Sequence, residues 1–137
     1  MAIISELIRE ESNGTISFGD YTLGSKSKKE DFKHGGDLYK VKTFKEITKL
    51  ERNGAFVYES VPGTAVNELS ISENEVSFSV EGFEDAQVTL ELEPETEYDI
   101  TVDGVDAGKM KTNLGGKLSL SVEIDSGKLV PVKVSKI

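Results

Sequence analysis

Alternation of apolar and polar residues in the second half of the chain is the feature that most limits the fold. Val76, Phe78 and Val80 alternate with polar residues. The same two-residue period recurs in four later segments, 88–92, 98–102, 118–124 and 130–134. A period of two turns one face of each segment toward a core and the other toward water. Because half-buried strands of this kind are typical of antiparallel sheets, the pattern predicts a layered β structure.

Short turn sequences separate these segments. Pro94 follows the second of them, and glycine-containing pairs mark the later corners: Asp103-Gly104, Gly115-Gly116 and Ser126-Gly127. Short strands with turns at about ten-residue spacing favour a sandwich. We therefore predict a mainly β chain, folded over residues 1–137 as a single domain. The fold class is an antiparallel β-sandwich, immunoglobulin/fibronectin-like or jelly-roll-like.

The first sixty residues give weaker patterns. Residues 3–8 fit a short amphipathic helix, although the nearby Asn13-Gly14 is also a strong hairpin-turn signal. Residues 24–37 are polar and rich in lysine and glycine, which predicts a long exposed loop. Thr43 and Glu46 form a capping-box pattern, and a glycine follows at position 54. The sequence therefore predicts one short helix over residues 44–52.

The net charge of −9 is unevenly distributed. Residues 1–60 carry ten basic and ten acidic residues, whereas residues 61–137 carry six and fifteen. We interpret the chain as a neutral N-terminal lobe followed by an acidic β-sandwich half. An acidic surface repels nucleic acid and anionic lipid, so we expect neither as a partner. The absence of cysteine and of a signal-peptide pattern makes cytoplasmic localisation the expected one.

Candidate catalytic and metal-ligating groups are few. His34 precedes two glycines in the predicted loop, where a general base would be poorly held, so we expect a solvated side chain. The alternate acidic residues of 91–99 fit a solvated strand face better than a paired-carboxylate site. Residues 103–108 have only half of a calcium-loop pattern, and residues 113–119 only part of a phosphate loop. We predict no catalytic residue, metal or cofactor.

Association is the function that these features favour. Seven of the ten aromatic residues lie in the first sixty positions, together with an apolar N-terminal segment. We expect a non-enzymatic structural or interaction protein that acts through self-association, with a glycan- or peptide-binding module as the alternative and an unrecognised hydrolase third. The residues proposed for the interface are Ile3, Ile4, Leu7, Ile8, Tyr39, Phe56 and Tyr58.

One local motif resembles a known family. Residues 92–102, Leu-Glu-Pro-Glu-Thr-Glu-Tyr-Asp-Ile-Thr-Val, resemble the tyrosine corner of fibronectin type III and related immunoglobulin-like domains. In those domains the tyrosine begins a strand and its hydroxyl bonds back to the preceding corner. The resemblance implies a structural role for Tyr98.

Two longer stretches, residues 36–54 and 103–119, resemble a family of small bacterial proteins labelled endosialidase. Sialidases hold the substrate carboxylate with three arginines and carry tryptophan-containing motifs, whereas this chain has only Arg9 and Arg52 and no tryptophan. No catalytic residue can therefore be transferred to it. What the resemblance implies is a non-catalytic assembly module, of the kind that builds trimeric phage fibres.

Overall fold

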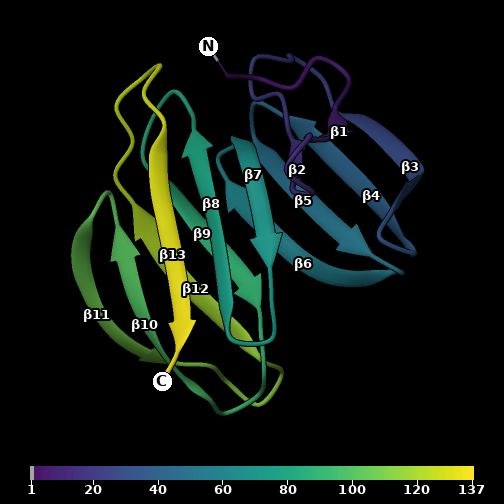
Figure 1. The fold of residues 1–137 in the computed structure, drawn as a ribbon. Coiled ribbons are helices and arrows are strands. Elements are labelled where there is room, and N and C mark those ends of the chain that lie inside the picture. The colour runs from purple at the N-terminus through teal and green to yellow at the C-terminus, as the bar shows by residue number, and fades with distance from the viewer. Residues whose placement is uncertain (1) are drawn as a thin grey trace.

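The computed structural model describes residues 2–137, which form thirteen β-strands in two antiparallel sheets. Sheet A has seven strands in the order β1-β2-β7-β8-β13-β10-β11, and sheet B has six in the order β12-β9-β6-β5-β4-β3. The fold is thus a β-sandwich, as predicted (Figure 1). The strands are β1 (Ile8–Glu10), β2 (Ile16–Phe18), β3 (Ser27–His34), β4 (Asp37–Phe44), β5 (Ile47–Arg52), β6 (Ala55–Val61), β7 (Ala65–Ile71), β8 (Glu75–Glu81), β9 (Ala86–Glu91), β10 (Glu97–Val102), β11 (Val105–Lys111), β12 (Lys117–Val122) and β13 (Val130–Lys136).

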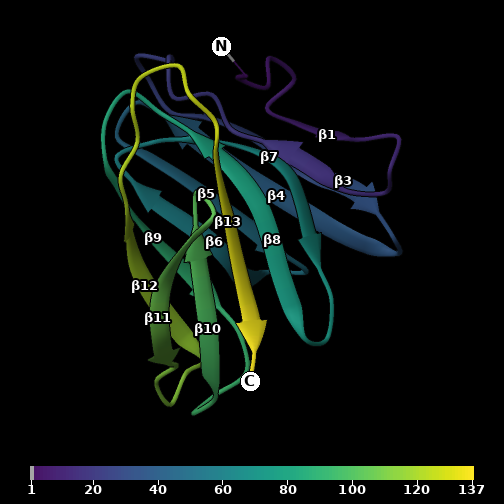
Figure 2. The ribbon, with the colours of Figure 1, turned by 60° about the vertical axis from the view of Figure 1, so that its left-hand side comes forward.

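The two halves of the chain share both sheets. β1 and β2 join sheet A through the pairing of β2 with β7, and β3 to β6 join sheet B through the pairing of β6 with β9. Four of the six strands of sheet B therefore come from residues 27–61, and the rest of the chain after them supplies only β9 and β12 to this sheet. In Figure 2 the purple and blue N-terminal strands lie in the same two sheets as the green and yellow C-terminal strands.

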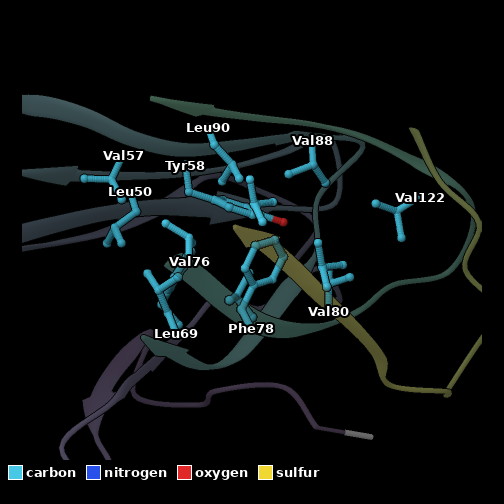
Figure 3. Packing of buried hydrophobic residues seen from close by; sticks show 14 of the residues in the cluster. Leu50, Val57, Tyr58, Leu69, Val76, Phe78, Val80, Val88, Leu90 and Val122 are labelled. Atoms are coloured by element: carbon cyan, nitrogen blue, oxygen red, sulfur yellow. The ribbon is translucent and has the colours of Figure 1, made fainter. Parts of the chain in front are cut away.

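The core lies between the two sheets. The rings of Tyr58 from sheet B and Phe78 from sheet A meet edge to face, with centroids 5.6 Å apart. Phe18 packs against Tyr58 in the same way at 5.4 Å. Figure 3 shows the rings of Tyr58 and Phe78 surrounded by aliphatic side chains from both sheets. The alternating segments predicted as strands supply much of this core, because their apolar residues are the buried ones.

A buried cluster of hydroxyl groups lies at one side of the core. The Thr48 hydroxyl donates to the Thr64 carbonyl at 2.8 Å, accepts from the Thr64 amide at 3.0 Å, and lies 2.8 Å from the Thr43 hydroxyl. The Thr64 hydroxyl in turn lies 2.8 Å from Tyr58 Oη and 2.7 Å from Ser60 Oγ. All five residues are fully buried. This network joins β4, β5 and β6 to the segment that crosses from sheet B to sheet A.

The predicted helix over 44–52 is wrong, since these residues form the β4–β5 turn and strand β5. Phe44, Ile47 and Leu50 have helical spacing, but the side chains that are fully buried are Thr48 and Leu50, which have strand spacing. Asn53 and Gly54 both have positive φ, 52° and 81°. That geometry suits the tight turn of a hairpin, so the glycine read as a helix end instead joins β5 to β6.

Two other N-terminal predictions also change. Strand β3 occupies Ser27–His34, so the expected long loop over 24–37 is wrong. It is an edge strand whose side chains are largely exposed, and its polar sequence therefore lacks an apolar alternation. Residues 3–8 are not helical but turn into β1, and Asn13-Gly14 forms the β1–β2 hairpin.

Candidate functional site

Strand β11 is the most exposed strand of the sandwich. It lies at one edge of sheet A, pairs only with β10, and all seven of its residues are exposed. The Thr112 amide donates to the Thr96 carbonyl just beyond the strand, at 3.0 Å. Because backbone groups in antiparallel strands point alternately toward and away from the partner, the amides of Lys109 and Lys111 face away from β10. β11 thus presents unpaired backbone groups at its outer edge.

Apolar side chains accompany this open edge. Met110 is opposite Tyr98 and Val105 is opposite Val102, so both lie on the core-facing side of sheet A. Tyr98 is buried, yet Met110 is 38% exposed and Val105 is 67% exposed. Sheet A therefore extends past the cover that sheet B provides, and the apolar face of β11 meets solvent. An uncovered apolar edge strand is a site where another chain can pair.

The charges of β11 are separated along the strand. Asp106 lies near its beginning, and Lys109 and Lys111 lie near its end. None of the three takes part in the nine ion pairs formed within residues 2–137. Asp106 instead accepts the Gly108 amide at 2.8 Å. These charged groups are therefore free to meet charges on another molecule.

The other sheet edges are less open to pairing. β3 contains a register shift and a residue, Asp31, with a φ of 56°, and it carries many charged side chains. Bulges and charges of this kind discourage edge-to-edge contact. β1 has only three residues. β12 buries its apolar side chains and exposes serines between them. β11 is thus the edge whose chemistry best fits a contact surface.

A cleft of about 410 Å³ opens between the sheets at one end of the sandwich. Phe56, Leu69, Leu92 and Tyr98 contribute apolar lining. Arg52 lies at the same cleft and forms no ion pair with a carboxylate of the described residues. The cleft therefore combines an apolar floor with one unpaired cation, a common design for small ligand sites.

Three of the four glutamates that line this cleft are paired with lysines, and the fourth, Glu73, forms no ion pair within residues 2–137. Lys136 Nζ lies 2.6 Å from Glu93 Oε2, and this hydrogen bond raises the pKa of Lys136. Glu91 is 3.8 Å from Lys117, and Glu75 is 3.7 Å from Lys133. Glu75, Glu91 and Glu93 thus each face a cation rather than a second carboxylate.

Most of the interface residues expected from sequence lie inside the monomer. The buried ones, which cannot meet a partner on the surface, are Ile4, Ile8, Tyr39 and Tyr58. Ile3, Leu7 and Phe56 are half-buried. The Phe56 ring lies beneath the ammonium groups of Lys117 and Lys49, whose nitrogens are 4.5 Å and 5.8 Å from its centroid. Patterning identified these side chains as apolar but could not tell a core position from a surface one.

Two single residues are placed more specifically. The Tyr98 hydroxyl accepts a hydrogen bond from the Glu93 amide at 3.2 Å, which is the contact that the corner motif implies. His34, expected as a solvated loop side chain, instead ends strand β3 and is half-buried. Its Nδ1 lies 2.5 Å from Glu10 Oε1, and its ring packs near Tyr39.

No group of three or more His, Cys, Asp or Glu in residues 2–137 is arranged to hold a metal ion. Asp103 of the partial calcium pattern pairs with Lys128 at 3.6 Å. None of the described residues belongs to a helix long and apolar enough to cross a bilayer.

Comparisons with protein-family models, with curated proteins and with solved structures each give no match. The resemblance of residues 36–54 and 103–119 to the endosialidase-labelled family therefore stays a prediction. The sequence pattern does not predict strand β11, because it indicates only a corner at Asp103-Gly104 and half of a calcium-loop pattern over 103–108. The turn is Asp103-Gly104 alone, and the strand after it lacks an apolar alternation that could signal it.

Proposed function

We propose that this chain is a non-enzymatic interaction protein that self-associates through strand β11. The observation that carries the proposal is an edge strand that is exposed along its whole length and has uncovered apolar side chains. Pairing there would satisfy the outward amides of Lys109 and Lys111 and cover Met110 and Val105. Pairing of a second strand with β11 would thus satisfy the backbone amides and cover the apolar side chains at the same time.

A second copy of the same chain fits this edge. In an antiparallel pair, the beginning of one β11 lies beside the end of the other. Asp106 of each copy then approaches the lysine-bearing end, Lys109 and Lys111, of its partner. Opposite charges in neighbouring strands favour such pairing, and a two-fold arrangement closes the assembly as a dimer. The acidic remainder of the chain would keep the dimer soluble.

The paired carboxylates support the non-enzymatic part of the proposal. Acid–base catalysis requires a group whose proton affinity matches its task and which can reach a substrate. Glu75, Glu91 and Glu93, the cleft carboxylates with close cations, are placed instead as partners of lysines. Their geometry favours a role in holding the ends of the strands.

Matched substitutions test the association. Met110→Asp places a charge on the proposed contact, whereas Leu38→Asp places one on a similarly exposed apolar residue of sheet B, 43% exposed against 38%. We expect light scattering to give a dimer mass for the native chain and for Leu38→Asp, and a monomer mass for Met110→Asp. Near-equal masses for the two variants would contradict a contact at β11.

Peptide binding at the end cleft is a second candidate function. The specific observation in its favour is Arg52, an unpaired cation beside the apolar lining of Phe56 and Leu92. An extended peptide with a carboxylate could place its apolar side chains on the floor and its charge on the arginine. A glycan fits less well, because Phe83, on another part of the surface, is the aromatic residue with a largely exposed ring in the described chain. Peptide-array binding that is lost in Arg52→Gln would support this candidate.

A further inference from the structure

Glu81 is a buried carboxylate with no cation beside it among residues 2–137. Its side chain is at the end of β8 and is 1% exposed. One of its oxygens, Oε2, accepts hydrogen bonds from the Tyr21 hydroxyl at 2.9 Å and from the Ala2 backbone nitrogen at 2.7 Å. It forms none of the nine ion pairs within residues 2–137. Burial of a carboxylate is costly unless a positive charge compensates it.

The nitrogen that meets this carboxylate is held firmly in place. The Ala2 carbonyl accepts from Asn67 Nδ2 at 3.0 Å, and the Ile4 amide donates to the Gly19 carbonyl at 3.0 Å. The Ile4 side chain is fully buried. Gly19 also donates its amide to the Leu7 carbonyl at 2.9 Å. The segment therefore docks against Gly19, just after β2, and against Asn67 of β7, with the Ala2 nitrogen directed at Glu81.

We propose that Glu81 is the acceptor site for a free α-ammonium group at Ala2, produced by hydrolysis of the peptide bond that precedes this residue. Water adds its oxygen to the carbonyl carbon of the preceding residue, the C–N bond breaks, and the Ala2 nitrogen takes up protons. An aminopeptidase that removes Met1 and an endopeptidase that cuts a longer precursor before Ala2 give the same terminus. The inference is independent of the proposed self-association.

A positive charge on the Ala2 nitrogen strengthens its hydrogen bond to Glu81 without requiring either group to move. A neutral amide that donates one hydrogen bond becomes an ammonium with three donors, and α-amino groups are largely protonated near neutral pH. Hydrogen bonds between charged partners are shorter and stronger than neutral ones. A cation at Ala2 also supplies a compensating charge that no other residue of 2–137 gives to buried Glu81. Processing would therefore fix residues 2–7 against sheet A and stabilise the fold.

Two chains that differ by one residue test this site. A removable N-terminal fusion partner, whose protease leaves no extra residue, gives chains that begin at Met1 or at Ala2. We expect the Ala2 chain to have a melting temperature about 3 °C or more above that of the Met1 chain. Glu81→Gln should abolish the difference, because the amide cannot pair with the charge. Chemical acetylation of the Ala2 nitrogen should have the same effect.

Amine labelling provides a readout that does not depend on the folding of the variant. In the native Ala2 chain, we expect the α-amino group to react with an acylating reagent at least about tenfold more slowly than after denaturation in urea. Equal melting temperatures for the two chains, an equal difference in Glu81→Gln, or fast labelling of the folded Ala2 chain would each overturn the proposal. Edman sequencing of the protein purified from its natural source should begin at Ala2, and any other terminus would overturn the processing step.

Discussion

Replacing Thr48 with valine removes one hydroxyl group and leaves the shape of the side chain almost unchanged. That hydroxyl donates to the Thr64 carbonyl at 2.8 Å, accepts from the Thr64 amide at 3.0 Å, and contacts the Thr43 hydroxyl. All of these groups are fully buried, so water cannot take the place of the lost partner. Each buried polar group left without a partner costs about 1–3 kcal/mol. With two such groups at Thr64, we expect the free energy of unfolding to fall by about 3–5 kcal/mol.

Urea denaturation measures this loss, with Thr89→Val as the matched control. The Thr89 hydroxyl also bonds to another hydroxyl, that of Ser119 at 2.9 Å, but on the exposed face of sheet B. We expect the control to change stability by less than about 0.5 kcal/mol, as most surface substitutions do. Because small domains unfold with only about 5–15 kcal/mol, Thr48→Val should shift the midpoint far. A loss below about 1 kcal/mol at unchanged denaturant slope would refute the reasoning that the network stabilises the fold.

Two other predictions concern the same end of the molecule. A Cβ added at Gly63 would lie 1.9 Å from the Phe44 carbonyl oxygen, so Gly63→Ala should lower the free energy of unfolding by about 1–3 kcal/mol in urea melts. The control is Gly82→Ala, whose Cβ would have its nearest contact at 3.5 Å and which should change the free energy of unfolding little. Equal effects of the two substitutions would contradict the packing argument. Burial raises the pKa of Tyr58 to about 12, above its ordinary value near 10, so the neutral form is favoured in the folded state. The stability this contributes, about 2–3 kcal/mol, is fully present below pH 10 and is lost as pH rises toward 12. Absorbance of the Tyr58 tyrosinate should therefore appear together with unfolding measured by circular dichroism, and ionisation of every tyrosine near pH 10 in a folded chain would contradict it.

The sandwich could be predicted because its second half obeys a simple rule. Val76, Phe78 and Val80 alternate with polar residues, and each of the three is buried. The prediction of a helix over 44–52 is wrong because it rests on the spacing of the apolar residues Phe44 and Ile47 alone. Thr43 and Thr48, which are polar, are the fully buried neighbours of these residues. Buried hydroxyls satisfied by one another look polar in sequence, so the core they help to form has no apolar signature.

The candidate site was harder to predict than the fold. The exposure of β11 depends on how far sheet B reaches beneath sheet A, which no local pattern encodes. The same limit explains why Tyr39 and Tyr58 were expected at an interface and are instead buried. The aromatic content of a segment shows that it carries many apolar side chains. Which of these side chains stay exposed depends on the pairing of strands that are distant in sequence, such as β2 with β7.

Hydrogen exchange at the outer edge of β11 is the most direct test of association through this strand. The amides of Lys109 and Lys111 point away from β10, so in a monomer they exchange freely with solvent. Exchange at these two amides should slow by about tenfold or more as protein concentration rises through the dimerisation range, while the amides of exposed turns stay fast. Fast exchange at Lys109 and Lys111 at every concentration, in a sample whose mass shows a dimer, would place the contact elsewhere and contradict the proposal.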